Sequence, residues 1–411
     1  MRATSLLRTI LNLKHTKVVG FEFSDCGLVV DVAPTTRLPR CAGCGQRCRR
    51  CYDARSRQWR HQDFAAMEVV LRYRIRRVQC DRCGVTTELV PWAEPGAWFT
   101  RDFEDAVALL AQRTDKTTLT QLMGISWQTV GSIIARVVDR RGRTDLLEGV
   151  THIGIDEVSY KRHHHYLTVV TDHVRGRVIW AGVGRTGETL RQFFDELGAE
   201  RTKALEVVSV DMCQAYIDVV RDRAPEAVLV FDRFHVQRLA HDALDEVRRS
   251  QVRELKDTEE GQAIKKTRWA LQKNPWNLTT GQHQKLAEVQ RVNRPLYRAY
   301  LLKETLCDVL DRSQVNVARQ KLHAWLAWAY RSRLEPFQKL AGTIKRHLEG
   351  IVAYVRTKVS NGRAEGMNNK LRTVTQRAYG FHGPSPLLGY IRLCCSGLVI
   401  PPVRHYPAVR M

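Results

Sequence analysis

The chain has 411 residues, enough for roughly two to four domains that each bury a core. Hydrophobic residues make up 44% and charged residues 27%, a balance that excludes a wholly disordered or fibrous chain. Lysine and arginine number 66 against 43 acids, and a net charge of +23 favours a polyanionic partner, above all nucleic acid. No apolar run reaches the roughly 18 residues that span a bilayer, and no secretory cleavage site follows the N-terminus. We therefore expect a cytoplasmic protein whose 11 cysteines are reduced.

The first 95 residues contain a predicted hairpin followed by paired cysteines. Alternating apolar residues over 18–32, with a turn at Ser24 to Gly27, are typical of two antiparallel strands. The pairs at Cys41 and Cys44 and at Cys80 and Cys83 have the C-x-x-C spacing of zinc knuckles. Two such knuckles close a tetrahedral site, so these four cysteines are the expected zinc ligands.

A third C-x-x-C pair, Cys48 and Cys51, leaves the ligand assignment within residues 41–51 open. Residues 40–80 also hold 11 arginines against three acids, a local charge of +8. A zinc module with this charge suits contacts to phosphates. The alternatives are buried free cysteines and a solvated charged face.

Residues 117–136 have the pattern of a helix-turn-helix. Leu119 and Leu122 belong to a first helix, Gly124 to the turn, and Ser126 caps a second helix whose apolar face follows. The alternative is a plain helical hairpin. In the helix-turn-helix, the residues exposed toward a DNA groove are Trp127, Gln128 and Ser132.

Strand patterns begin after residue 151 and predict an α/β core. The apolar runs lie at 153–156, 166–171, 177–183, 206–210 and 227–231, with a helix over 216–223. From His235 to about Glu349 the chain lacks such runs and is expected to be helical. Its tryptophans at helical spacing are expected in the core: Trp269, Trp276, Trp325 and Trp328.

Three acids stand out by their positions. Asp156 and Asp211 each end an apolar strand run, and Glu365 lies in a later helical segment. A strand-end acid that is buried without a partner costs several kcal/mol, but it is tolerated beside a cation. Two aspartates and one glutamate can hold two Mg²⁺ ions about 3.5 to 4 Å apart, the arrangement for phosphodiester cleavage and strand transfer. The alternative is that both aspartates cap the segments that follow them.

These motifs together resemble the ISL3 family of bacterial insertion-sequence transposases. The resemblance covers nearly the whole chain and rests on Gly154-Ile-Asp-Glu157, on Val210-Asp211 with Tyr216, on Asp232-Arg-Phe-His235 and on the segment Ser360 to Asn368. It implies an RNase H-like catalytic domain whose DDE triad falls on Asp156, Asp211 and Glu365. It also implies an N-terminal region that recognises terminal inverted repeats.

The resemblance extends to further residues. Asp232 and His235 are similar to a signature of several DDE families, and we expect them near the active site, orienting a metal ligand or the DNA. The alternative is a capping aspartate beside a packed histidine. Glu157 is expected on the opposite strand face from Asp156. The cations around Glu365 expected to contact scissile-strand phosphates are Arg356, Lys358, Arg363, Lys370 and Arg372.

The expected architecture is an α/β, RNase H-like core interrupted by an all-α insertion, with N-terminal zinc-ribbon-like and helix-turn-helix modules. The expected domains are a hairpin and zinc domain (1–95), a helix-turn-helix (96–150), the first part of the core (151–235), the insertion (236–345) and the C-terminal core (346–411). The predicted function is a DDE transposase that acts on double-stranded DNA near the nucleoid. Because two element ends must be paired, we expect a homodimer or larger assembly. Alternatives are a structure-selective nuclease on the same fold and a non-catalytic DNA-binding regulator.

Overall fold

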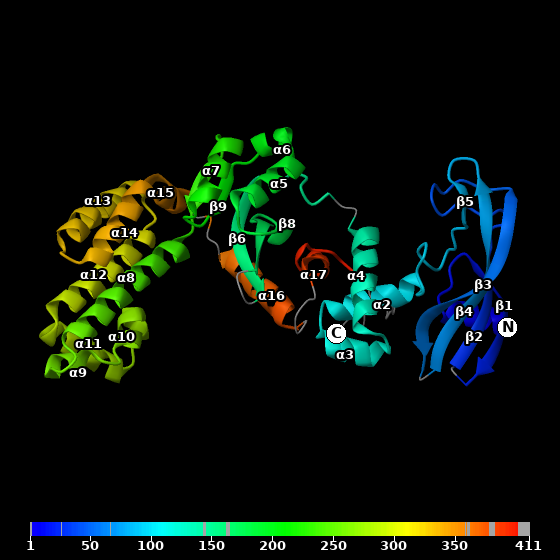
Figure 1. Ribbon diagram of the computed structural model, residues 1–411, viewed down its shortest axis with the longest axis horizontal. Coiled ribbons are helices and arrows are strands. Elements are labelled where there is room, and N and C mark those ends of the chain that lie inside the picture. The colour runs from blue at the N-terminus through cyan, green and yellow to red at the C-terminus, as the bar shows by residue number, and fades with distance from the viewer. Residues whose placement is uncertain are drawn as a thin grey trace. The chain divides into compact units, whose positions relative to one another are not determined.

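The structure, a computed structural model, describes residues 2–25, 27–65, 67–142, 145–161, 165–357, 359, 362–377 and 383–401. They form two compact units, each described by itself below (Figure 1). Unit 1 takes the described residues up to 142 together with Arg377, 383–394 and 398–401. Unit 2 takes those from Asp145 to Gln376 and Cys395–Gly397. Within the described ranges, no helix combines the length and apolar character needed to cross a membrane.

Unit 1 begins with a short helix and a five-stranded sheet. Its elements are α1 (Ala3–Ile10), β1 (Thr16–Ser24), β2 (Gly27–Pro34), β3 (Arg50–Phe64), β4 (Met67–Cys80) and β5 (Gly84–Thr87). The strand order is β1-β2-β4-β3 with β5 also on β4, and only β2 and β4 run parallel. The predicted hairpin is confirmed as β1 and β2. The long strand β3 was not predicted, because its arginine-rich sequence is mostly exposed and lacks apolar alternation.

Four helices complete unit 1: α2 (Arg101–Ala111), α3 (Lys116–Met123), α4 (Trp127–Arg141) and α17 (Pro384–Cys395). Gln112, which ends α2, donates from Nε2 to the carbonyls of Leu393 at 2.8 Å and Leu398 at 3.0 Å. Arg392 of α17 donates to the carbonyl of Gly142 at 2.9 Å. We expected residues 346–411 to belong to the catalytic core, whereas the structure places α17 beside the helix-turn-helix.

Unit 2 is built on a second five-stranded sheet. Its strands are β6 (His152–Lys161), β7 (His165–Asp172), β8 (Arg177–Val183), β9 (Val207–Val210) and β10 (Val228–Phe231), as predicted. The order is β10-β9-β6-β7-β8. Strand β7 is antiparallel to both of its neighbours, β6 and β8, whereas β6, β9 and β10 run parallel to one another. The intervening helices are α5 (Gly187–Leu197), α6 (Ala199–Lys203) and α7 (Gln214–Arg223). One face of the sheet packs on α5 and α7 through Ile155, Val210, Phe193 and Ile217.

The helical character expected after His235 is seen in the rest of unit 2. The helices are α8 (Arg233–Glu254), α9 (Glu259–Ile264), α10 (Arg268–Gln272), a 3₁₀ turn (Pro275–Asn277), α11 (Thr280–Val292), α12 (Arg294–Leu310), α13 (Val315–Arg331), α14 (Glu335–Arg346), α15 (Leu348–Thr357) and α16 (Gly362–Arg377). Trp325 is buried, and its indole donates to the carbonyl of Leu302 at 2.8 Å. Trp269 and Trp276 are 63% and 75% exposed, so the core prediction is wrong for these two. Both lie in short helical pieces with few buried residues.

Candidate functional site

Three aspartates lie on or directly after neighbouring parallel strands of unit 2, and the register of these strands aligns them in one row. The pairings of Gly154 with Ser209 and of Val210 with Phe231 fix the register of β6, β9 and β10. Continued by one or two residues, this register sets Asp156 beside Asp211 and Asp211 beside Asp232. Adjacent strands are about 4.8 Å apart, so the row brings together acids that lie 21 to 76 positions apart in sequence.

Each of these aspartates accepts a local backbone hydrogen bond. Asp156 Oδ1 accepts the N–H of Glu157 at 2.7 Å, and Asp211 Oδ1 accepts the N–H of Cys213 at 3.1 Å. Asp232 is buried and caps α8. The alternative interpretation of Asp232 as a capping residue is therefore correct for its backbone hydrogen bond. Such bonds set the rotation of a carboxylate while leaving its charge in place.

His235 lies close to the buried end of this row. Its Nε2 is 3.7 Å from Asp232 Oδ2, and its side chain is 17% exposed. Its Nδ1 is buried and has no hydrogen-bond partner among the described residues. The structure thus brings Asp232 and His235 together beside Asp211.

A polar layer that the sequence did not indicate lies one step behind the row. Gly154 and Ser209 precede Asp156 and Asp211 by two residues and share their sheet face. The buried His173 covers both, with its Nε2 2.7 Å from Ser209 Oγ. A Cβ on Gly154 would lie 2.5 Å from the same nitrogen, so glycine is required here.

Glu157 points to the opposite face, as expected from strand alternation. It lies near Tyr216 of α7, whose hydroxyl is 2.8 Å from Thr168 Oγ1. Burial raises the pKa of Glu157, and the nearby charge of Asp211 raises it further. The positive charge of Arg185 lowers the pKa of Glu157. Glu157 therefore belongs to the packing of α7 against the sheet.

The remaining sequence-predicted residues of this region lie on α15 and α16 or between them. Arg356, Lys370 and Arg372 are exposed. Glu365 and Arg363 belong to the first turn of α16, and their side chains lie outside the described residues, as does the whole of Lys358. The structure therefore describes the side chains of two members of the expected triad, Asp156 and Asp211.

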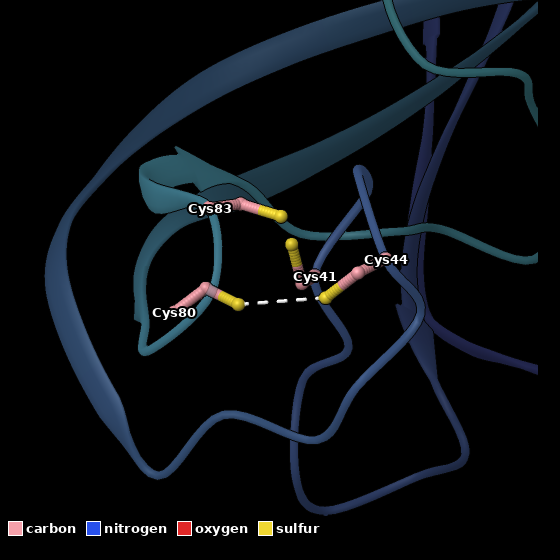
Figure 2. Close-up of side chains that lie close together, drawn as sticks. All are labelled: Cys41, Cys44, Cys80 and Cys83. Carbon is pink, nitrogen blue, oxygen red and sulfur yellow. Dashed lines mark hydrogen bonds between the residues drawn. The ribbon is translucent and has the colours of Figure 1, made fainter.

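Four cysteines gather in unit 1 as the knuckle spacing predicted (Figure 2). The Sγ atoms of Cys41, Cys44, Cys80 and Cys83 all lie within 4.8 Å of one another. Cys44 Sγ is 3.5 Å from Cys80 Sγ. Each knuckle turns at a glycine with positive φ, Gly45 at 74° and Gly84 at 71°.

The donor chemistry of this cluster fits zinc. Tetrahedral Zn–S bonds of about 2.3 Å place the sulfurs roughly 3.8 Å apart. The four Sγ atoms lie within 4.8 Å of one another, which is close to this spacing. The backbone N–H groups of Arg82 and Cys83 lower the pKa of Cys80 to about 6, whereas the neighbouring thiols Cys44 and Cys41 raise the pKa of Cys83. Within the described ranges, no other group of three or more such side chains lies this close together.

The third cysteine pair stays outside the cluster. Cys48 is buried nearby, but its thiol donates to the carbonyl of Gln46 at 3.7 Å. Cys51 is exposed on β3, where it pairs with Val78. The pairing of β3 with β4 therefore resolves the ambiguity that the spacing left.

The helix-turn-helix elements follow their sequence signals. The side chain of Asp115 caps α3, and Gly124 ends this helix in the left-handed conformation with φ of 60°. Ser126 caps α4 by accepting the N–H of Thr129 at 3.2 Å. Leu119 and Leu122 both lie on α3, as expected, with Leu119 buried and Leu122 62% exposed.

The outward side of α4 carries the predicted groove-facing residues. Gln128 and Ser132 are exposed, and Trp127 is half-buried. Lys116 Nζ lies 4.7 Å from the centre of the Trp127 ring, a cation–π distance. The first two turns of α4 thus present an amide, a hydroxyl and a half-buried aromatic ring beside one cation.

The other face of α4 holds a buried ion network that the sequence did not indicate. Glu104 of α2 accepts from Arg136 at 2.7 Å and Arg140 at 2.9 Å. Asp105 accepts from Arg140 at 2.6 Å and from Arg141 at 2.9 Å. These three arginines therefore hold α2 against α4.

The chain matches known protein families along most of its length. Residues 153–387 match the DDE-type ISL3 family described as "Transposase". Residues 88–138 match the "Helix-turn-helix domain of transposase family ISL3", and residues 37–83 match the "zinc-finger of transposase IS204/IS1001/IS1096/IS1165".

Two bacterial proteins are similar over nearly their full lengths. The "Transposase for insertion sequence element IS1557" of Mycobacterium tuberculosis is 40% identical over 430 aligned positions, which cover 97% of this chain and 96% of that protein. The "Transposase for insertion sequence element IS1001" of Bordetella parapertussis is 29% identical over 373 positions, covering 90% and 92%.

Proposed function

The chain belongs to the ISL3 family of insertion-sequence transposases, and we propose that Asp156, Asp211 and Glu365 form its catalytic triad. The observation that supports this proposal is the parallel pairing of β6 with β9, in which Gly154 pairs with Ser209 two residues before Asp156 and Asp211. Glu365 is assigned to the triad from the sequence motif of α16, because its side chain lies outside the described residues. The strand order β10-β9-β6-β7-β8, with β10, β9 and β6 parallel to one another and β7 antiparallel to β6 and β8, supports an RNase H-like core.

We propose that the triad holds two Mg²⁺ ions. Carboxylate oxygens at the spacing of adjacent strands are the hard ligands that Mg²⁺ prefers. When bound, these ions would activate water or a 3′-hydroxyl and stabilise the leaving oxygen. The backbone N–H groups of Glu157 and Cys213 hold the two aspartates in one rotation. The pair Asp232 and His235 keeps the adjacent end of the row in place.

The N-terminal unit supplies DNA recognition in this proposal. The cysteine cluster holds a structural zinc ion, and α4 enters the major groove of the terminal inverted repeats. Trp127, Gln128 and Ser132 then meet base edges. The phosphates of the scissile strand are contacted by Arg356, Lys358, Arg363, Lys370 and Arg372. Paired ends require a homodimer or larger assembly, formed on DNA in the bacterial cytoplasm.

A strand-transfer assay tests the catalytic proposal. Purified full-length protein is incubated with Mg²⁺, labelled DNA that carries the element's terminal repeats, and a target plasmid. Asp156→Asn, Asp211→Asn and Glu365→Gln are each expected to lower joined product at least about a hundredfold while end binding persists. The matched control Glu226→Gln removes an exposed carboxylate of unit 2 and is expected to join normally.

The same assay separates the other enzyme class. Cleavage without joining would indicate a nuclease on this fold. Retained joining in any of the three variants would remove that residue from the triad.

A further inference from the structure

A cleft of about 550 Å³ lies within unit 2, between the edge strand β10 and helices α7, α13, α14 and α15. Its floor is apolar, with Leu229 and Phe231 of β10 and Val352 of α15. Its rim is cationic. The cleft lies along β10 from Val228 to Phe231. This strand forms one edge of the sheet, and β8 forms the opposite edge.

Four exposed cations of the rim have no intramolecular ion pair in the described part of the chain. They are Arg221 of α7, Lys345 and Arg346 of α14, and Arg356 of α15. The acid in the lining, Glu349, is neutralised by Arg319 at 2.8 Å. The rim therefore carries an uncompensated positive charge assembled from three helices, in contrast to the paired arginines of α4.

The buried His347 adds an independent sign of a ligand. It lines the cleft and is 6% exposed, and its ring packs against Phe231 with 4.9 Å between centroids. Burial lowers its pKa, and the charges of Arg346 and Arg221 lower it further. Its Nδ1 finds no hydrogen-bond partner within the described ranges. A buried polar atom without a partner costs about 1–3 kcal/mol, a cost that a bound oxygen removes.

We propose that this cleft binds the phosphodiester backbone of a DNA strand along the edge strand β10, and that Arg356 links this contact to that of the scissile strand. Guanidinium groups suit phosphate because their N–H groups match its oxygens in pairs. The apolar floor accommodates the sugar face, and the volume falls within the range of ligand sites. The inference rests on the proposed function, since DNA is the polyanion that a transposase handles. It adds a second contact track along β10, toward the helical block.

Salt dependence provides the test. The affinity of the full-length protein for labelled terminal-repeat duplex, and for one of its strands alone, is measured between 50 and 200 mM salt. Each neutralised phosphate contributes about 0.9 to the slope of log affinity against log salt for a duplex, and about 0.7 for a single strand. The double variant Arg221→Gln with Arg346→Gln should therefore lower the duplex slope by about 1.8. Over this range wild type should lose about tenfold more affinity than the variant.

A matched control removes the same charge elsewhere. Lys285 and Arg291 are exposed on α11, away from the cleft lining, and the double change to glutamine should leave the slope at its wild-type value. Both double variants should unfold at the wild-type temperature, because all four side chains are exposed.

The outcomes are distinct. An unchanged slope in the cleft variant overturns the proposal, as does an equal fall in the control, which would indicate general surface charge. A change in self-association with an unchanged slope would instead assign the cleft to contacts between copies, and also overturns it. If Asp211→Asn loses joining while the cleft variant keeps the wild-type salt slope, the proposed function stands and the DNA-binding role of the cleft is refuted. If the cleft variant has a lower salt slope while Asp211→Asn still joins DNA, the cleft binds DNA and the proposed catalytic role of Asp211 is refuted.

Discussion

Replacement of Glu104 by alanine should loosen the helix-turn-helix. Glu104 is completely buried on α2 and accepts charged hydrogen bonds from Arg136 and Arg140 of α4. Glu104→Ala removes the shared acceptor of both guanidinium groups. The two arginines then remain between the helices with less negative charge to balance them.

The magnitude follows from the exposure of the partners. Removing one member of a buried ion pair costs about 3–5 kcal/mol. Arg136 and Arg140 are 30% and 15% exposed, and Arg140 keeps Asp105 at 2.6 Å. The expected loss in the free energy of unfolding is therefore at the lower end, about 3 kcal/mol. For a unit of this size that corresponds to roughly 6–12 °C in Tm.

Thermal unfolding of the full-length protein and hydrogen exchange of the α2 and α4 amides measure this effect. The control Asp139→Ala removes an exposed acid of α4 that has no ion pair in the described residues, and should change stability by less than about 0.5 kcal/mol. If Glu104→Ala matched this control in both measurements, the network would contribute no net stability and the reasoning would be refuted.

Three further predictions concern other parts of the molecule. Cys80→Ser should abolish bound zinc, measured by metal analysis, and lower the stability of unit 1, whereas Cys51→Ser should retain the metal. Gly154→Ala should cost about 1–3 kcal/mol and reduce joining, because the added methyl meets His173 Nε2 at 2.5 Å beside the aspartate row. Burial lowers the pKa of His61 below its ordinary value of 6.5, so the unfolded chain takes up this proton first as the pH falls. Stability should then decrease below pH 6.5 by up to about 1.4 kcal/mol per unit, and His61→Gln should remove that contribution in urea unfolding between pH 7 and 5.

These predictions have specific controls. Gly281→Ala in α11 adds a methyl that meets nothing within 4 Å, and should not lower stability or joining. Zinc lost equally from both cysteine variants would contradict the four-cysteine assignment. An unchanged pH dependence in His61→Gln would mean that this histidine is protonated equally in both states.

Much of the protein was determined by signals that act over a few residues. The C-x-x-C spacing places two thiols on one knuckle whatever surrounds it. Cys41 with Cys44 and Cys80 with Cys83 accordingly meet in one cluster. Ser126 caps α4 through a hydrogen bond only three residues away. Asp211 directly follows the apolar strand β9, and Asp156 follows the apolar run at the start of β6. Because β6 and β9 run parallel, the ends of these two runs lie toward the same side of the sheet. Family membership followed from these motifs in combination.

Tertiary structure decided what depends on residues distant in sequence. The pairing of β3 with β4 excludes Cys51 from the metal cluster, although its spacing resembles that of the ligands. His173 covers Gly154 only because β7 returns beside β6. Charge shows the difference most clearly. The sequence counts Arg140 and Arg346 alike, but α2 brings acids to the first, whereas in the described structure the second keeps its charge at an open cleft. Composition sums charges, and only packing determines which of them are neutralised within the fold.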